Sequence, residues 1–132
     1  MPGLTHVALA VADPDRSLRF YRDVVAVEGD VQAKEYGFVI NTSTGVNFTL
    51  FRGRAPSRVG DFHIGVSLPD GDAVHEARTR FRSMGVVEHE WVVEADYVSV
   101  KIEDPDGYLV EISWEPPDAS AASLSASVRF CG

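Results

Sequence analysis

The sequence predicts an α+β protein made of two βαβββ repeats, which form curved, cup-like mixed sheets with helices on their outer faces. The main observation is an internal repeat: an apolar strand, a turn and an amphipathic helical pattern occur at residues 4–25 and again at 61–84. Further strand-like segments separated by turn residues follow each of these strand–helix units. His6 and His63 occupy equivalent positions in the two apolar strands, 57 residues apart, which favours a duplicated unit over two unrelated halves.

The first repeat begins with residues 4–11 (LTHVALAV), a segment typical of a buried strand. Asp13 and Pro14 follow as a helix N-cap and a proline at the first helical position. The expected helix has one apolar face, formed by Leu18, Tyr21 and Val25. Two strands are expected after it, at residues 37–40 and 47–51.

The second repeat begins with residues 61–68 (DFHIGVSL), and residues 70–72 supply the turn and the helix cap. The apolar stripe of the following helix consists of Val74, Ala77, Phe81 and Met84. Gly85 is expected to end this helix. Three strands are expected afterwards, at residues 88–94, 97–102 and 108–114.

With 132 residues, the chain is expected to form a single domain over 1–132, with repeat units at about 4–54 and 61–115 and a tail at 116–132. The tail is rich in Ala and Ser and begins with Pro116 and Pro117, which end the last strand. Apolar residues alternate with polar ones near its end, so the sequence leaves two alternatives open: a short strand on a partner, or a flexible end.

The composition limits the classes of partner. A net charge of −8 argues against nucleic acid or an anionic membrane surface, because both are bound by clustered Lys and Arg side chains. No apolar run is long enough to cross a bilayer, the N-terminus lacks a signal-peptide pattern, and the lone Cys131 cannot form an internal disulfide. We therefore expect a cytoplasmic protein whose partner is a small molecule or a second copy of the chain.

The candidate site consists of His6, His63 and Glu111, which lie on three different predicted strands. Side chains alternate between the two faces of a strand, and each candidate shares its face with smaller or more polar residues. The opposite faces are bulky and apolar, as required for packing against a helix. The three side chains are therefore expected to face a cavity, where two histidines and one carboxylate form a set that binds a divalent metal and leaves positions open for chemistry.

Three segments give the chain a resemblance to the vicinal oxygen chelate superfamily, which includes glyoxalase I, extradiol dioxygenases, fosfomycin-resistance thiol transferases and bleomycin-resistance proteins. These segments are residues 5–23 (THVALAVADPDRSLRFYRD), 61–68 (DFHIGVSL) and 103–115 (EDPDGYLVEISWE). The resemblance spans about residues 4–115. It implies that His6, His63 and Glu111 are the metal ligands, and that a fourth ligand position falls near Thr49.

No subfamily matches at every position. Glyoxalase I is similar to this chain but has a carboxylate at the place of Thr49. Extradiol dioxygenases and fosfomycin transferases are similar in their ligands, and they have a tyrosine at the place of Lys101. The resemblance also implies a homodimer, and it leaves two alternatives open: a metal site within one chain, or one that draws His6 from one chain and His63 with Glu111 from the other.

A further set of residues is expected to surround the metal. Lys101 shares one face of its strand with Tyr97 and Ser99. One alternative is an ordinary solvated sheet face; in the other, Lys101 lies near the metal and binds an anionic group or acts as a base. We therefore interpret Lys101 as a candidate catalytic residue, and Thr49, Tyr97 and Ser99 as candidate substrate-binding residues.

Two functional hypotheses follow from the sequence. The first is a divalent-metal-dependent enzyme acting on a small oxygenated, anionic or catechol-like substrate that is chelated to the metal. Fe(II) or Mn(II) suits the nitrogen and oxygen donors, and Zn(II), Ni(II) or Co(II) remain alternatives. The second is a metal-free protein of the bleomycin-resistance type, which sequesters a drug or metabolite. The turn at Asp104, Asp106 and Gly107 is expected to join two strands and to carry no chemistry.

Overall fold

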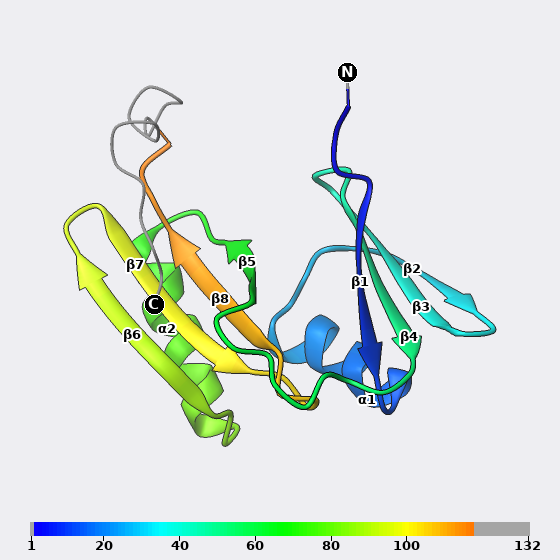
Figure 1. Cartoon of the computed structure of the whole chain (residues 1–132). Helices are drawn as coiled ribbons and strands as arrows, with labels where there is room; N and C mark the ends of the chain where they lie inside the picture. Colours follow the sequence, from blue (N-terminus) through cyan, green and yellow to red (C-terminus); the bar gives the residue numbers. More distant parts are fainter. Residues whose placement is uncertain (1, 118–132) are drawn as a thin grey trace. The chain divides into compact units, whose positions relative to one another are not determined.

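The computed structural model describes residues 2–117, which divide into two compact units (Figure 1). Among the described residues, the first unit comprises 2–58 together with 104–107, and the second comprises 59–103 together with 108–117. Most of the predicted tail, including its alternating apolar residues, lies outside the described residues. Each unit contains one open four-stranded mixed sheet, so the predicted α+β fold of two βαβββ repeats is confirmed.

The sheet of the first unit has the strand order β1-β4-β3-β2. Its strands are β1 (His6–Val11), β2 (Gly29–Lys34), β3 (Gly37–Thr42) and β4 (Asn47–Arg52). β1 and β4 are parallel, and the other neighbouring pairs are antiparallel. The helix α1 (Pro14–Arg19) follows β1 and continues as the π-helical segment η1 (Phe20–Val24).

The helical segment covers one face of this sheet. The side chain of Asp13 caps α1 by accepting a hydrogen bond from the backbone N–H of Arg16, as the sequence predicts. Tyr21 is almost completely buried, and its ring packs edge-on against that of Phe48 on β4 with 4.7 Å between centroids. The helix-covered face of β1 carries Leu9 and Val11, both buried. The face that carries His6 is therefore the one away from the helix.

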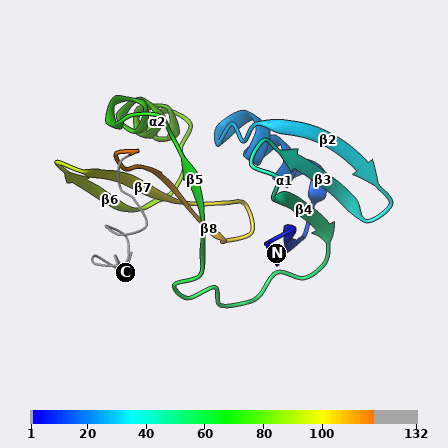
Figure 2. The same ribbon diagram turned by 90° about the horizontal axis from the view of Figure 1, so that it is seen from above.

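The sheet of the second unit repeats the first, with the strand order β5-β8-β7-β6. Its strands are β5 (His63–Ser67), β6 (Glu88–Glu94), β7 (Tyr97–Glu103) and β8 (Leu109–Trp114). β5 and β8 are parallel, whereas β8, β7 and β6 are antiparallel. The helix α2 (Gly71–Ser83) lies along one face of this sheet (Figure 2).

The packing of α2 determines which face of the second sheet is free for a site. The helix buries Val74, Ala77 and Phe81 against the sheet. Its first residue lies so close to the sheet that a Cβ added at Gly71 would be 3.3 Å from the side chain of Val98. Val98 and the residues that alternate with it on β7 therefore face the helix, and the intervening residues of β7 face the opposite side.

The predicted elements agree with the structure in order and type, with two differences. β2 was not predicted, because each of its residues (GDVQAK) is exposed and polar or small side chains dominate it. Such an edge strand forms through the backbone hydrogen bonds of its antiparallel pairing with β3, which leaves no hydrophobic pattern in the sequence. The π-helical end of the first helix was also not predicted.

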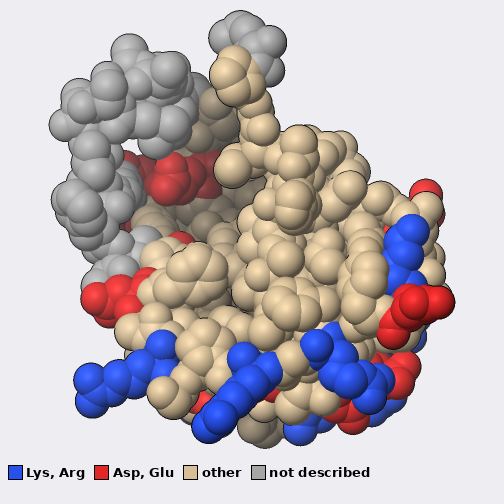
Figure 3. Space-filling view, turned by 45° about the vertical axis from the view of Figure 1, so that its right-hand side comes forward, with Lys and Arg blue, Asp and Glu red and all other residues tan. Residues whose placement is uncertain are grey.

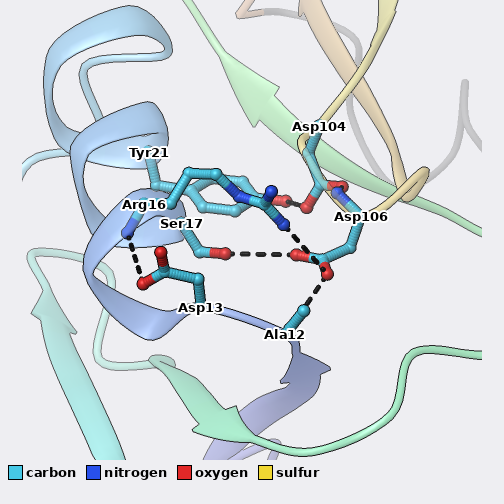
Figure 4. A network of polar contacts seen from close by, with 7 residues as sticks. All are labelled: Ala12, Asp13, Arg16, Ser17, Tyr21, Asp104 and Asp106. Carbon is cyan, nitrogen blue, oxygen red and sulfur yellow. Dashed lines mark hydrogen bonds and ion pairs between the residues drawn. The ribbon is translucent and has the colours of Figure 1, made fainter.

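The turn at residues 104–107 has a larger structural role than the sequence indicated, because it belongs to the first unit (Figure 4). The carboxylate of Asp106 accepts hydrogen bonds from the backbone N–H of Ala12 at 3.0 Å and from the hydroxyl of Ser17 at 3.2 Å. Arg16 lies 3.5 Å from the same carboxylate. The hydroxyl of Tyr21 donates to Asp104 at 2.6 Å. This network joins the turn to the end of β1, to α1 and to η1.

A second polar cluster lies between α2 and β6. The guanidinium of Arg78 donates to both carboxylate oxygens of Glu88, at 2.7 and 3.1 Å, and lies over the ring of Trp91 at 4.4 Å from its centroid. The hydrogen bonds from Arg78 lower the pKa of Glu88 from its ordinary value of 4.5. The edge of the sheet is thus joined to its covering helix by a charged pair at the surface.

The charged residues are mixed on the surface. On the face shown in Figure 3, Lys and Arg side chains lie among Asp and Glu side chains in the lower part of the view, and other residues form most of the upper part. None of the helices within residues 2–117 has the length and apolar character needed to span a bilayer.

The Asp106→Ala variant is expected to lower the free energy of unfolding by about 2 kcal/mol, because the backbone N–H of Ala12 and the buried hydroxyl of Ser17 lose their acceptor. Urea denaturation measures this loss. Asp30→Ala on the exposed strand β2 is the control, with an expected change within about 0.5 kcal/mol. Equal effects of the two substitutions would contradict the role assigned to the network.

The Glu88→Gln variant is expected to be less stable than the wild type at neutral pH and equally stable in acid. The folded-state pKa of Glu88 is lowered below 4.5, so the pair stabilises the fold above that pH and its contribution is lost as the pH falls through the lowered pKa. Thermal unfolding between pH 3 and 7 measures the difference, and Glu28→Gln at an exposed residue controls for net charge. A difference between wild type and variant that does not change with pH would refute this assignment.

Candidate functional site

The strongest candidate site lies on the face of the second sheet away from α2. Alternation along β7 and β8 puts Tyr97, Ser99, Lys101 and Glu111 on this face. All four are buried, with 2–7% of their surface exposed. A buried lysine and a buried glutamate on adjacent strands are uncommon in a protein interior, and such groups are retained where they have charged or hydrogen-bonded partners.

His63 is held in one tautomer by the backbone. Its ring Nδ1 lies 2.9 Å from the carbonyl oxygen of Asp61. A carbonyl oxygen can only accept, so Nδ1 carries the proton and Nε2 of the neutral ring presents a lone pair. A hydrogen bond from one ring nitrogen to a carbonyl is the usual way in which a metal-binding histidine is oriented.

The carboxylate of Glu111 has a different environment at each oxygen. Oε1 accepts hydrogen bonds from the hydroxyl of Ser99, at 2.8 Å, and from the hydroxyl of Tyr97. Oε2 points to His63 and lies 3.4 Å from its Nε2. One side of the carboxylate is therefore occupied by two hydroxyl donors, and the other side faces a ring nitrogen.

Nε2 of His63 and Oε2 of Glu111 lie close enough to share one partner. With a neutral ring and an ionised carboxylate both atoms present lone pairs, so a cation between them would be bound by both. A charge-assisted N–H···O hydrogen bond is typically about 2.7–2.9 Å long, which is shorter than the observed 3.4 Å. Two donor atoms each about 2.0–2.2 Å from one divalent ion lie roughly 3–3.5 Å apart. The separation therefore fits two ligands of a metal better than a direct hydrogen bond.

Lys101 is positioned between two acidic residues by strand register. Its direct cross-strand neighbours are Glu111 on β8 and Glu90 on β6. Nζ of Lys101 lies 3.6 Å from Oε2 of Glu90. Only 5% of Lys101 is exposed, so the solvated sheet face that the sequence left open as an alternative is wrong.

Gly65 leaves space beside this charged row. It pairs with Glu111 in the register of β5 and β8, and a Cβ added to it would meet no atom within 4 Å. The backbone of β5 is also exposed at this point. The position beside Glu111 on β5 is therefore not filled by a side chain.

Each sheet has a row of direct cross-strand neighbours at equivalent positions, but the row of the first unit carries no charged residue. The row across the second sheet contains Gly65, Glu111, Lys101 and Glu90. The equivalent row across the first sheet contains Ala8, Thr49, Val39 and Gln32. Thr49 therefore stands at the structural counterpart of Glu111, half-buried on the face away from the helix. The first unit lacks the carboxylate and the lysine of the second.

His6 lies at the start of β1, exposed, with its Nδ1 2.9 Å from the hydroxyl of Thr5. A hydroxyl can donate or accept, so this contact does not fix the tautomer of His6 as the carbonyl fixes that of His63. Within the described residues, no group of three or more His, Cys, Asp or Glu side chains is placed to hold a metal ion. Of the three predicted ligands, the second unit brings two together, His63 and Glu111.

Several functional contacts were not predicted from the sequence. The partner of Lys101, Glu90, was missed, although the alternation of β6 against β7 gives a signal for it. The carbonyl of Asp61 leaves no signal, because any residue supplies a carbonyl. Tyr97 and Ser99 were predicted to contact a substrate, and the structure shows that their hydroxyls donate to Glu111.

Residues 3–112 match the sequence profile of the Glyoxalase/Bleomycin resistance protein/Dioxygenase superfamily. A lactoylglutathione lyase from Agrobacterium tumefaciens has a TM-score of 0.67 and 26% identity, over 85% of this chain and 92% of that chain. A possible glyoxalase from Bacillus cereus has a TM-score of 0.71 and 21% identity, over 83% and 96% of the two chains. The fosfomycin resistance protein FosX from Listeria monocytogenes, complexed with Mn(II) and sulfate, has a TM-score of 0.72 and 21% identity, over 89% and 94%. No curated protein matches this chain significantly.

The Lys101→Met variant is expected to lower the free energy of unfolding by about 3 kcal/mol, because Glu111 stays buried and loses the cation beside it. Lys34→Met on the exposed strand β2 is the matched control, with an expected change within about 0.5 kcal/mol. Chemical denaturation of both variants measures the difference. If Lys101→Met were as stable as Lys34→Met, the charged row would have no part in the stability of the sheet.

Proposed function

This chain belongs to the glyoxalase/bleomycin-resistance/dioxygenase superfamily, the vicinal oxygen chelate proteins, and on that basis we propose that it is a divalent-metal-dependent enzyme. Its proposed substrate is a small oxygenated molecule with an anionic or catechol-like group. Superfamily membership supports a metal-dependent enzyme in general terms.

The observation that carries the proposal is the pairing of His63 and Glu111. Nε2 of His63 and Oε2 of Glu111 lie 3.4 Å apart, a separation that suits two ligands of one cation. Both ligands are oriented by further contacts, from the carbonyl of Asp61 and from two hydroxyl groups. Supporting contacts of this kind are typical of metal ligands.

His6 is the proposed third ligand. It occupies the position in β1 that His63 occupies in β5, at the start of the strand and on the face away from the helix. In this proposal its imidazole comes from the first unit of the same chain or of a second copy in a homodimer. Two neutral histidines and one carboxylate complete the set of donors and leave the remaining positions for substrate oxygens.

The donor set favours Fe(II) or Mn(II), and Zn(II), Ni(II) and Co(II) also accept nitrogen and oxygen ligands. The fosfomycin resistance protein from Listeria monocytogenes, which has the same fold, was determined with Mn(II), which supports manganese as the first ion to test. A divalent ion bound here would supply Lewis-acid chemistry, by holding substrate oxygens and stabilising negative charge on them.

The chain's own residues are proposed to orient the substrate. Lys101 is the proposed catalytic residue: its ammonium lies in the row that contains Glu111 and attracts an anionic oxygen of the substrate. Nζ of Lys101 lies 3.6 Å from a carboxylate oxygen of Glu90, and this ion pair holds the side chain in place for an electrostatic role. Thr49, Tyr97 and Ser99 are the proposed substrate contacts. The hydroxyls of Tyr97 and Ser99 donate hydrogen bonds to Glu111, so their oxygen atoms would accept hydrogen bonds from a substrate.

A metal-free binding protein of the bleomycin-resistance type is the second candidate. It is favoured by one observation, that the described residues contain no group of three or more donors placed to hold a metal. In that case the space beside Gly65 would hold a drug or metabolite, with Lys101 as its cationic contact. The two candidates differ in metal content.

The wild-type protein, purified without chelator and titrated with Mn(II), is expected to bind about one ion per site, and His63→Ala is expected to bind at least tenfold more weakly. His75→Ala is the control, because His75 lies on α2 and packs against Trp91. Calorimetry and metal analysis give the stoichiometry and affinity. Retention of metal by His63→Ala would contradict His63 as a ligand, and absence of binding in the wild type would leave the metal-free binding protein as the function. Oxygen uptake with catechols then separates a dioxygenase from a lyase or transferase.

A further inference from the structure

We propose that β2 is a docking surface for a second copy of this chain, whose own β2 pairs antiparallel with it and joins the two sheets. The inference concerns the first unit and does not depend on the metal site. β2 lies at the edge of its sheet (Figure 1) and, among the described residues, has one neighbouring strand, β3. The outer side of such a strand presents backbone N–H and C=O groups on which another strand can pair.

The backbone and side chains of β2 are suited to accept a strand. Its register with β3 runs over six residue pairs without a bulge. The strand contains no proline, and all of its residues are exposed, including Val31 at 37%. Bulges, prolines and charges of one sign are common protections of an edge strand, and β2 has none of them. Its two charged residues, Asp30 and Lys34, have opposite signs.

These charges match a second copy in one antiparallel register. In a two-fold symmetric pair each contact occurs twice, and side chains opposite one another share a face of the sheet. A pair centred on Gln32 puts Asp30 of each copy directly opposite Lys34 of the other. On the other face, Val31 lies opposite Ala33 of the second copy. Moving the centre by one residue along β2 removes both ion pairs, so the charges also select the register.

The counterpart of β2 in the second sheet, β6, is unsuited to pairing with itself. It carries Glu88, Glu90 and Glu94 and no Lys or Arg. An antiparallel pair centred on Trp91, its middle residue, would put Glu88 opposite Glu94 of the second copy. Its register with β7 also shifts between Glu88 and Glu90. Like charges that face each other destabilise a strand pair, so of these two counterpart edges only β2 suits a second copy.

The alternative is that Asp30 and Lys34 only keep this edge soluble, as charged side chains on edge strands often do. A solubilising charge acts whatever its sign, whereas a cross-strand ion pair needs opposite signs at the two positions. The net charge of −8 makes the two explanations separable. Asp30→Lys lowers the general repulsion between copies, but in the proposed pair it puts two lysines opposite each other.

Sedimentation equilibrium of the full chain tests the proposal with the wild type, Asp30→Lys, Lys34→Asp and the variant that combines both. The wild type is expected to form a weak, concentration-dependent dimer, because pairing at one edge buries a small area. Each single substitution is expected to weaken the dimer about tenfold, since two attractive pairs become repulsive. The combined variant is expected to recover the wild-type affinity, because opposite signs face each other again.

An equimolar mixture of Asp30→Lys and Lys34→Asp is expected to dimerise like the wild type, since each substituted residue then faces a residue of opposite charge. This recovery also shows that both variants are folded. Glu76→Lys on the exposed side of α2 is the matched control, because it changes the net charge as Asp30→Lys does and should not weaken the dimer.

Three results would overturn the proposal. A wild type that stays monomeric up to about 1 mM would show that β2 does not pair with a second copy. A dimer that neither single substitution weakens would be held by another surface. A mixture that associates no better than its components would refute the pairing of Asp30 with Lys34.

Discussion

Burial of the Glu111 carboxylate in the second sheet imposes the strongest constraint on this site. An ionised carboxylate removed from water costs several kcal/mol unless charges and hydrogen bonds compensate it. Glu111 is only 7% exposed, and its surroundings supply this compensation: two hydroxyls at one oxygen, an imidazole at the other and a lysine on the neighbouring strand. Oε2 of the same carboxylate lies 3.4 Å from Nε2 of His63, and this pair is the basis of the proposed metal site.

The two units share one topology, but the charged row that includes Glu111 occurs in the second unit alone among the described residues. Both units have the same topology, so each provides a histidine at the start of its first strand and a row of side chains across its sheet. The second unit places a glutamate and a lysine in that row, and the first places Thr49 and Val39 at the same positions. Only the row of the second unit contains carboxylates, which need hydroxyl donors and a counter-charge around them. The first unit instead contains the buried hydrogen bond between Tyr21 and Asp104.

The fold was predictable because it depends on patterns that local sequence carries: strand alternation, helix caps and apolar stripes. The facing of His63 and Glu111 followed from the same alternation. β2 was not predictable in this way, since its pairing with β3 uses backbone groups and its side chains are exposed. Contacts of backbone atoms, such as the carbonyl of Asp61 on His63, leave no trace in residue type. The turn at Asp104 was read as a plain connection, because its partners in α1 are far away in the sequence.

The most direct test of this account is a crystal structure of the protein with Mn(II), in which the anomalous signal locates the ion. We expect the ion bonded to Nε2 of His63 and to the carboxylate of Glu111. An ion bound elsewhere would contradict the central claim that the sheet holds this carboxylate ready for a metal.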